Sequence, residues 1–478
     1  MCAESNIQAS STREVNDLCF VVCDTVKEYF DNAAANYGEF GNIFALFFHD
    51  LVIHFTGIVL HRNALGEYPA LEPFPWVNKN YARMPARIIF DDRGQQKKEN
   101  PSIVKQLLKG WGLIPVAYGV SAQLAPPRHV FQNHAFKVLL QSASGSQAYL
   151  AKKDHQVNQL RDLISVLSRL LDLDNGKIVW ANWYDYAESF ITSQQKSIKS
   201  KGVFVGTRNN LQNRIHAINF RQQGKPVIGF THGEITNSVF DEPVFAYSDK
   251  TLCSTLVDYG SFTPTEETYP AIIKPAQVLR RSSPVVSSLY RPKADIQNRD
   301  LAGSQVLLIP TVYQGNCIYG PAHAYETDVY HKWHLAIASV IPNLTIKLHP
   351  KTRIKKEFPC STDYRKLEEC IEEYDVILFD FFSTAGVLAV FSDKPVIYFN
   401  IGLRRLHPVF ESALRRRCTT IDIDFEASWE PQIRRGLAEY DQKRDPVSNL
   451  EFGQYSLATQ PDFGLWSTIA DIMRSSQE

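Results

Sequence analysis

Residues 375–399 read DVILFDFFSTAGVLAVFSDKPVIYF, and this sequence is the clearest indication of the fold. Two short apolar runs, 375–379 and 395–399, flank a segment at 383–391 that has the composition of a buried helix. Continuous apolar strands that alternate with helices are typical of parallel sheets whose two faces are both buried. The stretch therefore predicts a strand, a helix and a strand of an α/β protein.

The same pattern extends towards the N-terminus. We expect strands at 305–310 and 344–348, a helix at 330–341 that Pro342 closes, and a polar helix at 363–373. Strands are also expected at 177–180, 202–206 and 226–230, with a helix at 210–223 that ends at Gly224. These two groups of elements predict an α/β fold with two Rossmann-like domains that face a cleft.

The 478 residues suffice for two to four domains. We expect an N-terminal region of unassigned role at 1–175, with a place on the acceptor side as one option. It is followed by a first Rossmann-like unit at 176–285 and a second at 303–478. Residues 276–302 are rich in Ser and Pro and show little periodicity, which predicts a linker between the two units.

Composition excludes several classes of protein. Lys and Arg number 51, as do Asp and Glu, so the chain has no overall positive field for nucleic acid, and we expect no nucleic-acid partner. The run 414–417, with three Arg, predicts a solvated face. The eight Cys are scattered without a CxxC pair, which indicates reduced, mostly buried thiols.

Two N-terminal features bear on localisation. The apolar stretch 42–61 contains His49, Asp50 and His54, which are costly in lipid, so we expect a buried segment and no membrane span. Residues 1–13 are polar and lack the layout of a signal peptide. We expect a cytoplasmic protein, with peripheral attachment to the inner face of the membrane as an alternative.

Hydroxyl side chains follow the expected strand at 375–379. Ser383 and Thr384 begin a helix, and ligands of open parallel sheets bind beyond the carboxyl ends of the strands. Unpaired N–H groups and a partial positive charge at a helix N-terminus favour a phosphate there. The alternative is that Ser383 and Thr384 only cap the helix.

Basic side chains end the expected strand at 344–348. His349 could donate a hydrogen bond to a phosphate oxygen, and Lys347 and Lys351 could supply charge, while Pro350 favours an extended backbone at His349. Thr311 follows the strand at 305–310. We expect the His349 and Ser383 groups on successive strands, at one edge of the sheet, where one pyrophosphate could touch both. The alternative is that a neighbouring loop satisfies His349.

The first unit offers a candidate general base. His232 follows the strand at 226–230 and precedes Gly233, whose backbone freedom can aim a side chain into a cleft. His232 could accept the proton of an acceptor hydroxyl, and Glu234 is the competing base. Either residue could instead cap the segment that follows.

Other patterns of catalytic and metal sites are missing or weak. The chain has no GxxxxGK[ST], no GxGxxG after a strand and no GxSxG, which disfavours P-loop, dinucleotide-binding and α/β-hydrolase proteins. Five residues resemble a metal set but lack a recognised zinc spacing, so we favour a polar face over a metal site. These residues are His323, Glu326, Asp328, His331 and His334.

The order of the short motifs resembles a known family. The motifs are 226–233 (PVIGFTHG), 310–311 (PT), 346–350 (IKLHP), 374–384 (YDVILFDFFST) and 394–399 (KPVIYF). They come in the order found in the GT-B-fold transferases of bacterial surface polymers. This group includes CDP-glycerol glycerophosphotransferases, polysialyltransferases and capsule Kdo transferases. The resemblance covers about residues 200–400.

The resemblance implies a GT-B-like fold and a metal-independent transferase. His349, Ser383 and Thr384 would hold the phosphate of a CMP- or CDP-linked donor, and His232 would lie near the reacting centre. Where retaining Kdo transferases carry an acid after the Pro-Thr pair, this chain has Gln314 and Asn316, which disfavours a Kdo-type double displacement. No cofactor beyond the donor is expected.

We therefore expect a transferase that moves a sugar or a polyol phosphate to a glycan or lipid-linked glycan acceptor in the synthesis of a surface polysaccharide. Two alternatives stay open. One is an enzyme like the non-hydrolysing sugar-nucleotide epimerases, and the other is a non-catalytic binding protein of a polysaccharide locus.

Overall fold

The computed structural model describes most of residues 276–457 and shorter parts of the remaining chain. The described residues are 21–22, 24–26, 28–29, 114–116, 162–163, 165–170, 202–205, 217, 220–221, 224–231, 252–261, 276–310, 327–348, 352, 356–404, 406–443, 445–457, 468–469 and 471–472. The expected strand at 177–180 and the apolar stretch at 42–61 lie outside them. None of the helices in the described ranges is long and apolar enough to cross a membrane.

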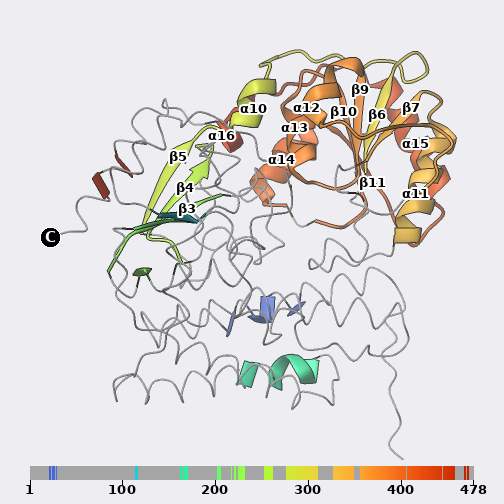
Figure 1. Ribbon diagram of the computed structural model, residues 1–478. Coiled ribbons are helices and arrows are strands. Elements are labelled where there is room, and N and C mark those ends of the chain that lie inside the picture. Colours follow the sequence, from blue (N-terminus) through green and yellow to red (C-terminus); the bar gives the residue numbers. More distant parts are fainter. Residues whose placement is uncertain are drawn as a thin grey trace, which may run out of the picture.

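The larger of two parallel sheets has the strand order β8-β7-β6-β9-β10-β11 (Figure 1). All neighbouring strands in it are parallel. In chain order the arrangement is 3-2-1-4-5-6, which is the strand order of the Rossmann fold. The strands are β6 (Val306–Ile309), β7 (Leu344–Lys347), β8 (Ser361–Asp363), β9 (Val376–Phe379), β10 (Val396–Asn400) and β11 (Thr419–Asp422).

Helices cover both faces of this sheet (Figure 1). One face carries α12 (Leu367–Cys370), α13 (Thr384–Phe391) and α14 (Pro408–Arg417), and the other carries α11 (Thr327–Val340) and α15 (Trp429–Gln442). Side chains of β6 alternate between the two cores, since Leu307 packs on the first face and Leu308 on the second. Burial on both faces explains why the sequence of the central strands is almost continuously apolar.

The expected polar helix at 363–373 is shorter than predicted. Residues 361–363 form the edge strand β8, and α12 passes directly into a 3-10 turn, η8 (Ile371–Glu373). Asp363 therefore belongs to the sheet, where its backbone lies opposite that of Lys347 in the register of β7 and β8.

The arginine run 414–417 is only partly a solvated face. Arg415 and Arg416 are exposed and form ion pairs with Glu411 and Glu451, respectively. The Arg417 side chain is fully buried, and its guanidinium donates hydrogen bonds of 2.8–2.9 Å to the carbonyls of Val390, Ser392 and Lys394. Arg417 thus supplies donors to carbonyls that the end of α13 leaves without helical partners.

The smaller sheet has the order β1-β2-β3-β4-β5, and its described strands are all parallel. They are β1 (Ile114–Val116), β2 (Val203–Val205), β3 (Val227–Phe230), β4 (Thr255–Tyr259) and β5 (Gln277–Arg281). Strand β1 lies in the region expected to precede the first unit, so this sheet begins earlier in the chain than residue 176.

The helix before β3 ends at Gly224 as predicted. Gly224 has a φ of +67°, its N–H bonds to the carbonyl of Arg221, and the N–H of Lys225 bonds to the carbonyl of Phe220. This pair of bonds around a left-handed residue is a Schellman motif, for which glycine is the favoured residue.

The linker expected at 276–302 is largely structured. Residues 277–281 form β5, and residues 284–289 form α10 (Pro284–Leu289), where the Ser283 hydroxyl accepts a hydrogen bond from the N–H of Val286. From 290 to 302 there is no helix or strand apart from one bridge, Ile296 to Val447. The prediction was wrong because β5 is an exposed, Arg-containing edge strand without an apolar run.

A C-terminal segment joins the two units. It comprises the 3-10 turn η9 (Leu450–Phe452) and α16 (Gly453–Ser456), and it packs in the core of the second unit through Phe452 and Tyr455. The N–H of Ser261, beyond β4, donates to the carbonyl of Gln454 at 2.7 Å. Gly260, with a φ of +73°, lies so close that a Cβ there would be 2.4 Å from that carbonyl oxygen. The close approach requires glycine at this position.

Asn449, which precedes η9, fixes this segment. Its fully buried side chain donates to the carbonyls of Arg291, Phe391 and Ser392 at 2.9–3.1 Å and accepts from the N–H of Lys293 at 2.8 Å. One side chain thus joins the end of α13 to the chain that follows α10.

We predict that Asn449→Ala lowers the free energy of unfolding by about 3 kcal/mol, because it leaves several buried polar groups without partners. Urea denaturation followed by circular dichroism measures the change. Asn343→Ala is the control, since the exposed Asn343 side chain makes one hydrogen bond to the carbonyl of Ala302, and it should cost less than about 1 kcal/mol. Equal losses in the two variants would contradict the assigned role of Asn449.

Candidate functional site

The strand order creates a topological switch point at the centre of the larger sheet. β6 and β9 are neighbours, and the chain leaves β6 towards the face covered by α11 but leaves β9 towards the face covered by α13. In open parallel sheets, ligands bind at such a switch point, beyond the carboxyl ends of the two strands. The residues that follow Ile309 and Phe379 therefore form the candidate site.

The N-terminus of α13 lies at this point. Ser383 is the N-cap residue with an extended backbone, and its side chain makes no capping hydrogen bond to α13. Thr384, the first residue of the helix, is exposed. The N–H of Val387 binds the carbonyl of Ser383 at 2.9 Å, so the N–H groups that precede it in the helix have no carbonyl one turn earlier to bind. Two hydroxyls and these N–H groups meet at one helix end.

Lys347, the last residue of β7, lies on the face of the sheet that α12 and α13 cover. Its side chain is 6% exposed, and its ammonium makes no hydrogen bond or ion pair with the part of the chain that the structure describes. The closest acid along the sheet, Asp363, is bound by Arg365 and Tyr374. Burial lowers the pKa of Lys347, and the electrostatic influence of Cys370 and Asp363 opposes the shift. A mostly buried lysine without a described hydrogen-bond partner is costly, which is typical of a group that serves a ligand.

The His349 and Ser383 groups were expected on successive strands at one edge of the sheet, and the structure corrects part of this expectation. β7 and β9 end at the same edge of the sheet, but they are not successive strands, because β8 comes between them in the chain and β6 lies between them in space. At about 4.8 Å per strand, their axes are about 10 Å apart. His349, Lys351 and Thr311 lie outside the described residues.

The turn between β9 and α13 is anchored by a buried acid that the sequence analysis did not single out. Asp380 accepts hydrogen bonds from the indole of Trp333 at 3.0 Å and bonds the ring of His334 at 2.6 Å, and all three side chains are almost completely buried. Trp333 and His334 belong to α11, on the opposite face from α13. The anchor thus ties the turn before α13 to the helix on the opposite face of the sheet.

The described members of the metal-like set, Asp328, His331 and His334, do not converge. His331 bonds the carbonyl of Glu357 at 2.8 Å, Asp328 pairs with Lys356, and His334 bonds Asp380. Within the described ranges no group of three His, Cys, Asp or Glu residues could hold a metal ion. His323 and Glu326 lie outside the described residues. The described members therefore have separate structural partners.

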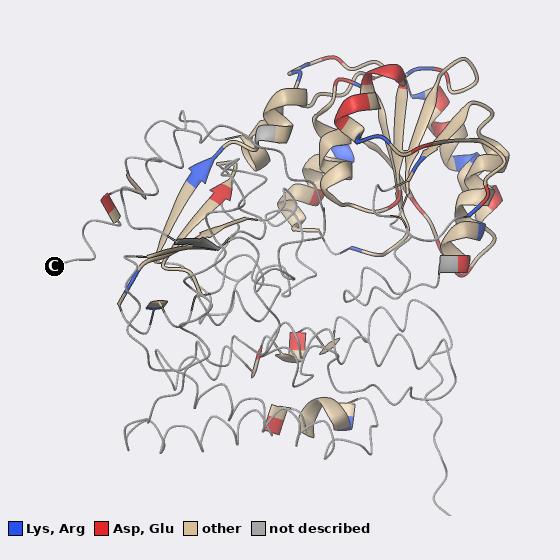
Figure 2. Ribbon diagram, viewed as in Figure 1, with Lys and Arg blue, Asp and Glu red and all other residues tan. Residues whose placement is uncertain are grey.

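The carboxyl end of the smaller sheet is held by a second buried acid. Asp258 of β4 accepts hydrogen bonds from the Thr231 hydroxyl at 2.5 Å and from the guanidinium of Arg280 at 3.2 Å. Figure 2 shows an acidic stretch of β4 beside a basic stretch of β5. Thr231 immediately precedes His232 in the sequence, so this network holds the residue next to the candidate base. His232 and Glu234 themselves lie outside the described residues.

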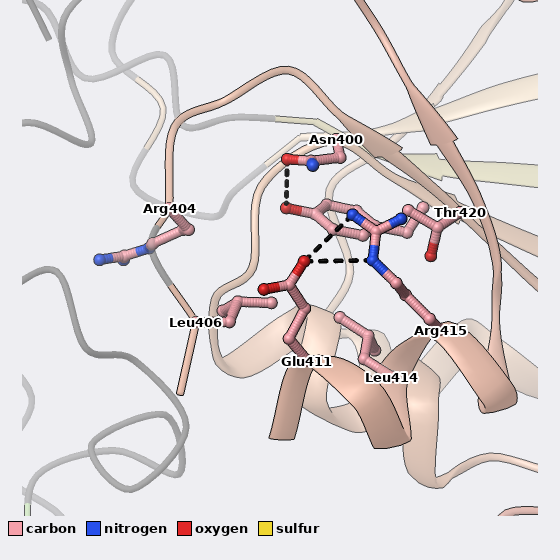
Figure 3. Close-up of a pocket in the computed structure, with 8 residues that line it drawn as sticks. Asn400, Arg404, Leu406, Glu411, Leu414, Arg415 and Thr420 are labelled. Atoms are coloured by element: carbon pink, nitrogen blue, oxygen red, sulfur yellow. Dashed lines mark hydrogen bonds and ion pairs between the residues drawn. The ribbon is translucent and has the colours of Figure 1, made fainter. Parts of the chain in front are cut away.

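A small pocket lies between the carboxyl half of β10 and α14 (Figure 3). Its polar wall contains Asn400, which accepts from the hydroxyl of Tyr398 at 3.3 Å, and the ion pair of Glu411 with Arg415. Arg415 also pairs with Asp422. Glu411, Arg415 and Asp422 therefore neutralise one another, and Arg404 also contributes to the lining of the pocket.

Comparison with known proteins gives little information on identity. No protein-family model matches the chain, and no curated protein matches it. Among solved structures, the chain is similar to Thermosulfurimonas dismutans KpsC, a beta Kdo 2,4 transferase. That similarity covers 43% of this chain and 74% of the other at 13% identity with a TM-score of 0.21. A TM-score this low carries no argument about fold or function.

We predict that Lys347→Met raises the stability of the free protein at pH 7 by about 1 kcal/mol, because it removes a buried charge that has no partner in the described structure. Burial lowers the pKa of Lys347 in the folded state, so its charge costs the full stability penalty below that lowered pKa. The penalty disappears as the pH rises from there to the unfolded-state pKa of about 10.4. The advantage of the variant should therefore shrink as the pH rises through the alkaline range towards about 10.4.

Urea denaturation at several pH values measures this difference. Lys394→Met is the matched control, because Lys394 pairs with Glu372 at 3.2 Å and should give no gain. A loss of stability in Lys347→Met at pH 7 would show that the ammonium has a stabilising partner.

Proposed function

We propose that the protein is a transferase that moves a sugar, or a glycerol or ribitol phosphate, from a CMP- or CDP-activated donor to a surface-polysaccharide acceptor. One observation carries the proposal. The N-terminus of α13, where the Ser383 side chain makes no capping hydrogen bond and Thr384 is exposed, lies at the switch point of a 3-2-1-4-5-6 sheet. The mostly buried Lys347 lies at the same edge and on the same face. The order of the sequence motifs supports the same donor class.

The described groups suit the charge of a nucleotide donor. The donor phosphate would lie at the N-terminus of α13, where Ser383, Thr384 and the first N–H groups donate hydrogen bonds. Lys347, with Thr311, His349 and Lys351, would supply the remaining donors and positive charge. When the bond between the transferred group and the phosphate oxygen breaks, negative charge grows on the leaving nucleotide, and donors fixed in advance stabilise it. This neutralisation requires no metal ion.

The acceptor would enter from the smaller sheet. Its hydroxyl oxygen would form the new bond to the anomeric carbon, or to phosphorus for a polyol phosphate, while the nucleotide leaves with the electrons of the broken bond. The leaving group is CMP for a CMP-sugar or a CDP-polyol and CDP for a CDP-sugar. His232, or alternatively Glu234, would take the hydroxyl proton. The buried Asp258 supports this assignment because it holds Thr231, next to His232, in place.

The proposal implies a nucleotide-activated donor and a glycan or lipid-linked glycan acceptor as substrates. We place the reaction in the cytoplasm, where a lipid-linked acceptor would bring the enzyme to the inner face of the membrane or to a polysaccharide assembly complex.

We predict that the protein binds CMP and CDP, and that Ser383→Ala weakens the affinity about tenfold, because a hydrogen bond to a charged phosphate is worth about 1.5–3 kcal/mol. Isothermal titration calorimetry with CMP, CDP, UMP and UDP measures the binding. Ser428→Ala is the matched control, because Ser428 is also an N-cap residue without a capping hydrogen bond, at the start of α15 beyond the edge strand β11. The control should bind CMP as tightly as the wild type.

The alternatives give different results. An absence of binding to all four nucleotides would support a non-catalytic protein and overturn the proposal. Conversion of a UDP-sugar without an acceptor would support an epimerase. His349→Ala should abolish transfer from a cytidine donor without changing the unfolding midpoint, and near-normal transfer would remove His349 from the donor site.

A further inference from the structure

Arg404 approaches the turn between β9 and α13 from a neighbouring strand. It follows β10 in a loop whose flanking residues, Ile401 and Leu403, are buried in the core on the α11 face. The residue itself is 9% exposed. Figure 3 shows its guanidinium directed away from Glu411 and Arg415, so it does not join the charge cluster on α14.

The guanidinium makes two contacts with the turn. Its Nε donates to the carbonyl of Phe382 at 3.1 Å, and its central carbon lies 4.4 Å from the centre of the Phe381 ring. A guanidinium at this distance from an aromatic ring is stabilised by a cation–π interaction, and partial burial strengthens it. Arg404 therefore fixes both residues that directly precede Ser383.

The orientation of the Phe382 carbonyl sets the backbone that enters α13. The carbonyl carbon of Phe382 and the nitrogen of Ser383 belong to one planar peptide unit, so holding the carbonyl oxygen also holds the N–H of Ser383. Asp380 fixes the other end of the turn through Trp333 and His334. Only Phe381 and Phe382 lie between Asp380 and Ser383, so the turn is constrained at both ends.

From this geometry we propose that Arg404 is a positioning residue for an anion-binding turn. It acts through the Phe382 carbonyl and the Phe381 ring, so that the N–H groups and hydroxyls at the start of α13 face the phosphate of the nucleotide. The choice of ligand rests on the proposed function, whereas the ordering of the turn does not. Lysine cannot replace this side chain, because it has neither the Nε–H at this place nor a flat guanidinium to cover the ring.

Arg404→Lys tests the inference, because it keeps the positive charge. We expect its affinity for CMP to fall about tenfold in calorimetry, as is usual when a charge-assisted hydrogen bond is lost, with one site per chain retained. A purely structural defect would instead lower the number of sites and leave the affinity of the folded fraction unchanged. Arg434→Lys is the matched control, because Arg434 is an exposed arginine of α15 that pairs with Glu430.

A second measurement requires no ligand. The N–H of Val387 makes the first hydrogen bond of α13, to Ser383, and its hydrogen–deuterium exchange reports the order of the turn. We expect about tenfold faster exchange in Arg404→Lys than in the wild type and the control. Phe381→Leu removes the aromatic ring but leaves Arg404 in place, so it should give a smaller increase in the exchange rate at Val387. It serves as a second variant in case Arg404→Lys fails to fold.

The outcomes separate the two proposals. If the wild type binds no CMP, the proposed function is wrong, and the exchange at Val387 still decides the role of Arg404. If Arg404→Lys keeps the exchange rate of the wild type, Arg404 does not position the turn. If exchange rises while CMP affinity stays at the wild-type value, the turn is not the anion site.

Discussion

Because the larger sheet is buried on both faces, the polar side chains of its central strands are restricted to the ends of the strands. The central strands satisfy their backbone groups within the sheet and must present apolar side chains to helices on either side. Polar chemistry is therefore excluded from the middle of β6, β9 and β10 and concentrates at the strand ends. At the carboxyl edge, Lys347, Asp380 and Asn400 appear within one residue of the ends of their strands.

The same constraint explains which strands the sequence could predict. β6, β7, β9 and β10 carry near-continuous apolar runs and were predicted from them, as were β2 and β3. The strands that escaped prediction include β1, β5, β8 and β11, which lie at the sheet edges of the described strand order. An edge strand has no neighbour on one side, so it tolerates Pro115 in β1 or the exposed polar residues of β8. β4 escaped because the buried Asp258 interrupts its apolar run.

The sequence could predict only those parts of the candidate site that are made by residues adjacent in the chain. Ser383 and Thr384 follow an apolar run and precede a helix, so their place at a helix end could be read from the sequence. The bond of His334 to Asp380 joins residues 46 positions apart, and the bond of Arg404 to Phe382 spans 22 positions. No periodicity connects such pairs, because only the strand order brings them together. His334 resembled a metal ligand for the same reason, since its spacing from His331 was visible and its contact with Asp380 was not.

The distribution of charge distinguishes the proposed site from the rest of the second unit. Arg415, Arg416 and Arg434 each have a carboxylate partner, and Arg365 is held by Asp363 and Glu373. Such pairs lie at the surface, where solvent screens them, and each contributes little to stability. Lys347 combines burial with the lack of a described partner, and it shares an edge and a face with a helix end whose N-cap hydroxyl is unused. Both features weaken the free protein, and a single phosphate would satisfy both, because its oxygens can accept from an ammonium, from hydroxyls and from backbone N–H groups together.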